Sequence, residues 1–269
     1  KKIDDKHLQS MAFSGFAIVC QKRGDFKKSI KYHNTNIEIK KSIDDKNGLA
    51  STYCNLSSCY FDSGDIKKAK NLLKTGLDIF NEIGMKRSVH IGNFELSKFL
   101  CFEDRFQDAI NAIEPAIIYF DKIKDTIYLL RSQIQLSRSL RYNQNIADAK
   151  KILNTALKTA QTIKHNLLIL RINIELNLCK TEDPKSLTSL EKLIKETKNN
   201  DLHAYIYFNI HKHTNDPKSK NLAKVKYLKL YKDTPKYEYK YYLDQLKWYN
   251  SLQLNTSCKS DFLTLPLKV

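Results

Sequence analysis

Three arginines are spaced so that they could bind one anionic group together. Arg131, Arg138 and Arg141 lie seven and three residues apart, so an α-helix would place all three along one stripe. Lys98 precedes Arg138 by 40 residues, and Arg171 follows Arg131 by 40. Guanidinium groups offer paired donors to carboxylates and phosphates, so the cluster could clamp either. The alternative is ordinary solvated charge, partly paired with Asp or Glu.

Apolar residues accompany these basic residues at the same spacing. Phe94, Ile134 and Ile174 follow one another at intervals of 40 residues and are expected to supply apolar contact. A peptide or partner segment, acidic or ending in a carboxylate, would fit such a surface. The candidate partner-binding residues are therefore Phe94, Lys98, Arg131, Ile134, Arg138, Arg141, Arg171 and Ile174.

The sequence contains no recognisable catalytic or cofactor-binding pattern. It lacks a Gly-rich phosphate loop, a GxSxG motif and an HExxH motif. His203, His211 and His213 form the densest group of histidines, but a helix would point the last two in different directions. No Cys or acidic residue completes an obvious tetrahedral set with them. We therefore predict no enzyme activity, no cofactor and no metal ion.

The net charge of +17 suggests nucleic acid as a partner, but the charge is not concentrated. Residues 201–269 carry 12 Lys against 6 Asp and Glu, close to a proportional share of the excess. The Lys-rich stretch from Lys218 to Lys232 includes Tyr227 and Tyr231 and could contact RNA. Its regularly spaced apolar residues favour an ordinary helix instead, so RNA binding is kept only as a third hypothesis.

Six cysteines without a CxxC pair indicate a reducing compartment. Several of them fall at apolar positions of a helical pattern, where a free thiol acts as a small hydrophobic group. The sequence has no run of 18 apolar residues and no signal segment, so we expect a cytoplasmic protein without a membrane partner.

A period of 40 residues organises the chain and determines what each position does. One column is apolar throughout and reads Phe16, Leu56, Leu96, Leu136 and Leu176. A second column is unbroken and reads Ile3, Ile43, Ile83, Ile123 and Ile163. The low content of 7 Gly and 5 Pro agrees with long helices and not with a turn-rich β fold.

Within each copy, the apolar spacing resolves into two helices. In the second copy these are expected over about 48–62 and about 66–82, with Gly64 ending the first and Asp65 capping the next. Gly24 and Asp25 repeat this device. Ala69 and Gly76 occupy positions where helices must approach closely, and their equivalents in other copies are also small.

This pattern resembles the tetratricopeptide repeat (TPR) family, in its variant of about 40 residues. The signature residues are Tyr53, Leu56, Tyr60, Gly64, Ala69, Leu73 and Gly76. The resemblance covers about residues 1–235, with a degenerate fifth copy and a sixth at a shorter spacing of 34 residues. It implies an all-α fold, a right-handed superhelical solenoid of stacked antiparallel helix hairpins, whose first helices line a concave groove. The Lys and Asn residues with which chaperone-binding relatives hold a carboxylate are not found here.

The expected domain spans residues 1–252. Its hairpins are expected at about 8–43, 48–83, 88–123, 127–163, 167–198 and 202–235, followed by an amphipathic capping helix over 236–252 that covers the open face of the last hairpin. Residues 253–269 are expected to form an irregular tail. Because Ile3 would close a hairpin whose first helix is missing, we expect an upstream hairpin and possible self-association through the open N-terminal face.

These observations predict a non-catalytic scaffold that binds a protein or peptide in its concave groove, as the regulatory or sensor part of a larger cytoplasmic protein. The alternative is the ligand-sensing half of a signalling or transcription regulator similar to peptide-pheromone receptors, which use such repeats.

Overall fold

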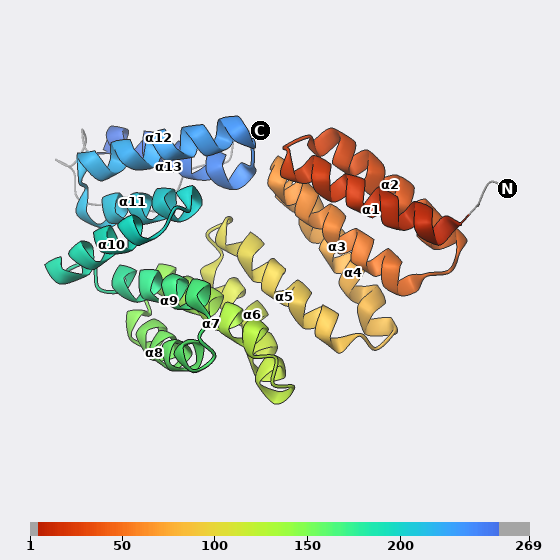
Figure 1. The fold of residues 1–269 in the computed structure, drawn as a ribbon, viewed down its shortest axis with the longest axis horizontal. Helices are drawn as coiled ribbons and strands as arrows, with labels where there is room; N and C mark the ends of the chain where they lie inside the picture. Colours follow the sequence, from red (N-terminus) through yellow and green to blue (C-terminus); the bar gives the residue numbers. More distant parts are fainter. Residues whose placement is uncertain (1–4, 253–269) are drawn as a thin grey trace.

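The computed structural model describes residues 5–252, with side chains through Lys247, and the predicted all-α solenoid is confirmed (Figure 1). The expected tail at 253–269 lies outside the described residues, as does Ile3. Thirteen helices and no strand are found in the described part, and none of these helices has the length and apolar content that a membrane crossing requires. The helices are α1 (Lys6–Lys22), α2 (Phe26–Ser42), α3 (Lys46–Ser63), α4 (Ile66–Glu82), α5 (Lys86–Cys101), α6 (Phe106–Lys122), α7 (Thr126–Tyr142), α8 (Ile146–Thr162), α9 (Asn166–Leu178), α10 (Pro184–Glu196), α11 (Asn200–Thr214), α12 (Pro217–Asp233) and α13 (Tyr237–Leu252).

One turn geometry recurs every 20 residues through the first eight turns between helices, so it joins the helices within each hairpin and between hairpins alike. In each turn, one residue has a positive φ and the next residue is the N-cap of the following helix. The turn after α3 shows the predicted device, because Gly64 has φ +98° and Asp65 accepts a hydrogen bond of 3.0 Å from the backbone N–H of Lys68. The left-handed positions are Gly24, Asp44, Gly64, Gly84, Asp104, Lys124, Gln144 and Lys164.

Close helix packing depends on small residues at the predicted positions. Ala69, Ala109 and Ala149 are completely buried where the two helices of a hairpin meet. The Ser57 hydroxyl donates a hydrogen bond of 2.8 Å to the Ala69 carbonyl, so a polar side chain is satisfied inside the same contact. The larger apolar side chains then form one continuous core along α5 to α9.

The regular register ends after Lys164. Helices α9 and α10 have 13 residues each, compared with the 17 residues of α4, α6 and α8. Beyond this break, α11, α12 and α13 build a second aromatic core around Tyr227 and Tyr242.

Helix α13 packs on α12, as a capping helix should, but it also reaches the other end of the solenoid (Figure 1). The ring of Pro235, just before α13, lies against Gly24 in the α1–α2 turn, where a side chain at Gly24 would come within 2.4 Å of it. The Thr234 hydroxyl donates to the Lys22 carbonyl at 3.4 Å, and Tyr237 meets the ring edge of Phe61 at 6.0 Å. The C-terminal helix therefore lies inside the curve of the solenoid and connects its first and last hairpins.

Candidate functional site

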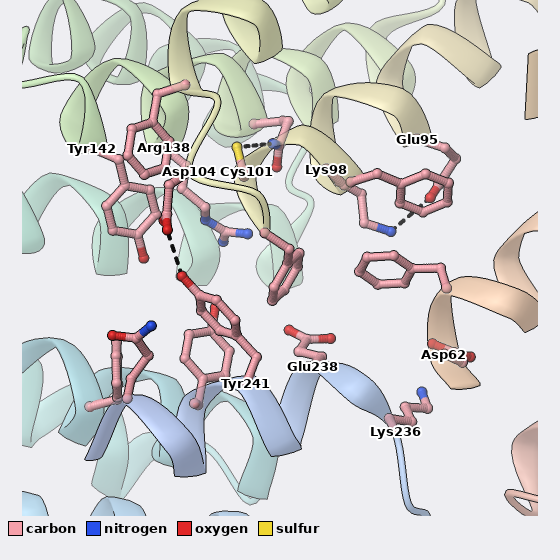
Figure 2. Close-up of a pocket in the computed structure, with 18 of the residues that line it drawn as sticks. Asp62, Glu95, Lys98, Cys101, Asp104, Arg138, Tyr142, Lys236, Glu238 and Tyr241 are labelled. Carbon is pink, nitrogen blue, oxygen red and sulfur yellow. Dashed lines mark hydrogen bonds and ion pairs between the residues drawn. The ribbon is translucent and has the colours of Figure 1, made fainter. Parts of the chain in front are cut away.

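A cavity of about 320 Å³ lies on the concave side, between α13 and the first helices of four hairpins (Figure 2). Helices α3, α5, α7 and α11 form its walls, together with the turn after α5, and α13 closes one side. The prediction that first helices line the groove agrees with this arrangement. The sequence did not indicate that α13 would fill part of the same groove.

Aromatic rings form much of the cavity wall. Phe61 stacks on Phe99 at 4.5 Å between ring centroids, and Phe102 meets the ring of Tyr241 edge-on at 5.1 Å. The Tyr241 hydroxyl donates a hydrogen bond of 3.2 Å to Asp104, a residue of the turn after α5 (Figure 2). These contacts fix α13 against α3 and α5, so the cavity has a defined shape.

Two of the predicted arginines are held by a buried acid that the sequence interpretation missed. Arg138 donates to one oxygen of Glu175 at 2.7 Å, and Arg141 donates to the other at 3.2 Å. Tyr205 accepts from Arg141 at 2.9 Å and donates to Glu175 at 2.9 Å, while Asn209 accepts from Arg141 at 3.2 Å. We call these five residues the Arg–Glu network.

Burial alone raises the pKa of the Glu175 carboxyl, but the charges of Arg138 and Arg141 and the hydrogen bonds within the network outweigh burial, so the net pKa is lowered. Glu175 and Arg141 each have side chains that are 2% exposed. The network is therefore a hydrogen-bonded unit within the concave wall in which one carboxylate is shared by two guanidinium groups.

The network corrects part of the predicted binding surface. The Arg141 guanidinium donates hydrogen bonds to Glu175, Tyr205 and Asn209, and its side chain is 2% exposed, so it is not accessible to a ligand. Phe94, Ile134 and Ile174 are 8%, 6% and 2% exposed, so they belong to the packed core. Phe94 and Ile134 are buried in the core along α5 to α9, whereas Ile174 lies in the core that α11 to α13 build and Arg141 is covered by α11.

Four predicted residues keep an accessible side chain. Lys98 lines the cavity and pairs with Glu95 at 2.8 Å, and Arg138 lines it with its side chain 32% exposed. Arg131 lies over the rings of Phe94 and Tyr128, at 5.2 Å and 4.9 Å.

Arg131 and Arg171 are exposed, and neither forms an ion pair within residues 5–252. Partial loss of solvation lowers the pKa of the Arg171 guanidinium, the charges of Arg138 and Arg131 lower it further, and those of Glu238 and Glu175 raise it in part. Three like charges therefore meet at this part of the groove, and Glu175 compensates only one of them directly.

One signal in the sequence could have revealed Glu175. The 40-residue column that contains it reads Gly15, Asn55, Glu95, Gln135 and Glu175, and it is polar in every copy after the first. Glu95, the other acid of this column, pairs with the predicted Lys98. The acids that pair with Lys98, Arg138 and Arg141 therefore lie in one column of the repeat. This column directly precedes the apolar column that contains Leu56.

The histidines do not come together as a metal site. His203 shares a hydrogen bond of 2.7 Å with the Thr197 carbonyl, and His211 one of 3.2 Å with the Asp216 carbonyl. No group of three potential metal ligands occurs among the side chains that the structure describes.

The fold and the cavity define the chain as a helical-repeat solenoid with a concave cavity, and comparisons with known proteins agree. Residues 8–82 match the sequence model described as tetratricopeptide repeat. This part of the chain therefore contains tetratricopeptide repeats, and the predicted resemblance is confirmed. No protein with a curated description matches the sequence.

Known structures show the same fold along most of the chain. Aspartyl phosphate phosphatase F from Bacillus subtilis is 13% identical with a TM-score of 0.72, covering 98% of this chain and 65% of its own. The apo form of RapI is 13% identical with a TM-score of 0.70, covering 84% of both chains. NprR in complex with its cognate peptide NprX is 16% identical with a TM-score of 0.66, covering 92% of this chain and 72% of its own.

Proposed function

We propose that this chain is a non-catalytic binding module that holds a peptide, or an extended segment of a partner protein, in its concave groove. The observation that carries the proposal is the pair of exposed arginines, Arg131 and Arg171, beside Arg138. Neither arginine forms an ion pair with a described residue, although Glu238 and Glu175 lie near Arg171, so an anionic ligand that pairs with both would offset their repulsion with Arg138. We therefore expect an acidic residue or a C-terminal carboxylate on the ligand to meet Arg131 and Arg171.

The cavity beside these arginines adds a place for a ligand side chain. Its lining combines aromatic rings with charged side chains of both signs, so the cavity offers a ligand both apolar contact and ion pairing. NprR, which shares the fold, is known in complex with a peptide, and this supports a peptide as the class of ligand.

We also propose that the module is the regulatory or sensor part of a larger protein, whether a scaffold or a signalling or transcription regulator. The gene's full reading frame separates these alternatives, because only a regulator would carry an attached effector domain. Self-association through α1 stays a prediction, supported by Phe16, which is 54% exposed where its equivalent Leu56 is 2% exposed.

Selection from a random peptide display library tests the binding proposal. We expect enrichment of peptides that share an acidic residue, and at least about tenfold weaker binding to an Arg131→Ala/Arg171→Ala variant. Lys151→Ala/Lys158→Ala is the matched control, because both lysines are exposed on α8 and the net charge changes equally. Failure to enrich any peptide, or equal loss in both variants, would contradict the proposal, and retention on RNA at low salt would favour the RNA hypothesis.

A further inference from the structure

Two carboxylates of the cavity have no basic partner. Asp62 of α3 and Glu238 of α13 both line the cavity, but neither forms an ion pair with any residue that the structure describes (Figure 2). Two basic residues that line the same cavity are paired with other acids, because Lys98 pairs with Glu95 and Arg138 pairs with Glu175. Asp62 accepts one hydrogen bond of 2.8 Å, from Gln21.

A third possible acceptor for a ligand is the Tyr242 hydroxyl. Tyr242 is 7% exposed, and its ring stacks on Tyr227 at 5.0 Å between centroids. Tyr242 lines the cavity, and its hydroxyl makes no hydrogen bond with the residues that the structure describes. The hydroxyl oxygen is not one of the fully enclosed polar atoms that lack a partner, so it stays accessible and can accept a hydrogen bond from a ligand.

The surrounding rings favour a cation over a neutral donor. Phe61, Phe102 and Tyr241 line the same cavity as the carboxylates, and aromatic faces attract ammonium and guanidinium groups. Lys236 also lines the cavity, but its ammonium lies over the Tyr239 ring at 5.9 Å. The combination of free carboxylates, a free phenol oxygen and aromatic faces is the chemistry that receives a positively charged head group.

We propose that this cavity takes the cationic side chain, arginine or lysine, of a bound peptide, with its head group between Asp62 and Glu238. The inference rests on the proposed function and adds to it, because Arg131 and Arg171 would meet an acidic group while the cavity meets a basic one. The ligand is then zwitterionic along its length. A purely acidic peptide fits this groove less well, since the cavity's main donors are already paired.

Proton linkage supplies an independent readout of the same contact. Burial raises the pKa of both the Asp62 and the Glu238 carboxyl. The hydrogen bond from Gln21 and nearby lysines offset it only partly at Asp62, and Lys98, Arg138 and Lys236 do so at Glu238. A bound cation favours the ionised carboxylates, so binding should release protons and strengthen as the pH rises above the ordinary Glu value of 4.5.

The test uses three small probes on the full chain: N-acetyl-arginine amide, its neutral isostere N-acetyl-citrulline amide, and N-acetyl-glutamate amide. We expect the arginine probe to shift the NMR signals of cavity residues, with an affinity at least about tenfold above that of citrulline. Glu238→Gln and Asp62→Asn should each weaken arginine binding by about tenfold. Glu182→Gln, which changes an exposed glutamate outside the cavity, should leave it unchanged. Lys236→Ala should strengthen it, because a competing cation is removed.

Three results would overturn the cation site. These are equal binding of arginine and citrulline, unchanged arginine binding by Glu238→Gln, and no arginine binding at a probe concentration of ~10 mM, which is enough for a fragment of this size. Each leaves the proposed function standing if the display library still yields peptides that require Arg131 and Arg171. If the library yields no peptide but the arginine probe still binds the cavity, the peptide proposal is contradicted and the cation site is not.

Discussion

Two glutamates on the concave side, Glu175 and Glu238, show opposite ways of placing a carboxylate inside a repeat protein. Glu175 lies on α9, is 2% exposed, and receives both Arg138 and Arg141. Glu238 lies on α13, faces the cavity, and has no ion pair within residues 5–252. The pKa of Glu175 is lowered, because its partners outweigh burial, whereas burial raises the pKa of Glu238.

The difference separates structural charge from charge available to a ligand. A buried acid with fully engaged basic partners holds helices in one arrangement, and removing it leaves those partners uncompensated. An unpaired acid beside an open cavity has a desolvation cost, and a cationic ligand can offset that cost. The arginine spacing in the sequence could not make this distinction, because it depends on where Glu175 and α13 lie in space.

Replacing Glu175 by Gln should have the largest effect on stability. The variant leaves Arg141 buried and without a counter-charge, so we expect the free energy of unfolding to fall by about 3–5 kcal/mol. Urea unfolding monitored by circular dichroism measures it. Glu196→Gln is the control, because this glutamate is 52% exposed and pairs only with Lys192, so its loss should cost less than about 1 kcal/mol. Similar values for the two variants would show that the Arg–Glu network is not structural.

A smaller effect should follow from breaking the contact that positions Glu238. Gly24→Ala and Gly84→Ala both place a side chain at positive φ, +78° and +73°, so both lose backbone freedom. Only the first meets another segment, since its Cβ would come within 2.4 Å of the Pro235 ring, and nothing lies within 4 Å at Gly84. We expect Gly24→Ala to cost about 1–2 kcal/mol more than Gly84→Ala.

Amide hydrogen exchange locates that loss. Protection of residues 237–246 should fall in Gly24→Ala and stay unchanged in Gly84→Ala, because only the first disturbs the docking of α13 on the N-terminal hairpin. If exchange in α13 is the same in both variants, α13 is held by α12 alone. The contact between the two ends of the solenoid then contributes nothing to stability.

The sequence predicted the fold well and the site less well, for physical reasons. Packing columns such as Leu56 and Ala69 repeat because every hairpin makes the same contact with its neighbour, and a repeated contact leaves a periodic signal. The pairing of Arg141 with Asn209 spans 68 positions and joins hairpins that differ in length. The contact of Pro235 with Gly24 joins the ends of the curve. Each occurs once, so no period could reveal it.

The smallest expected effect, and the one that tests the comparison most directly, is the pH dependence of Glu238→Gln. A carboxyl with a raised pKa contributes stability that is fully present below its unfolded value, ordinarily 4.5, and is lost as the pH rises through the folded value. The neutral Gln avoids that loss, so the variant should become more stable relative to the wild type as the pH rises from 4.5 toward neutrality. Glu175→Gln should show the opposite trend, because a lowered pKa contributes stability above 4.5 that is lost only in acid. Unfolding free energies of both variants, measured from below pH 4.5 up to neutrality, test this comparison. Curves of the same sign would mean that the two glutamates are paired alike and that Glu238 has no charge available for a ligand.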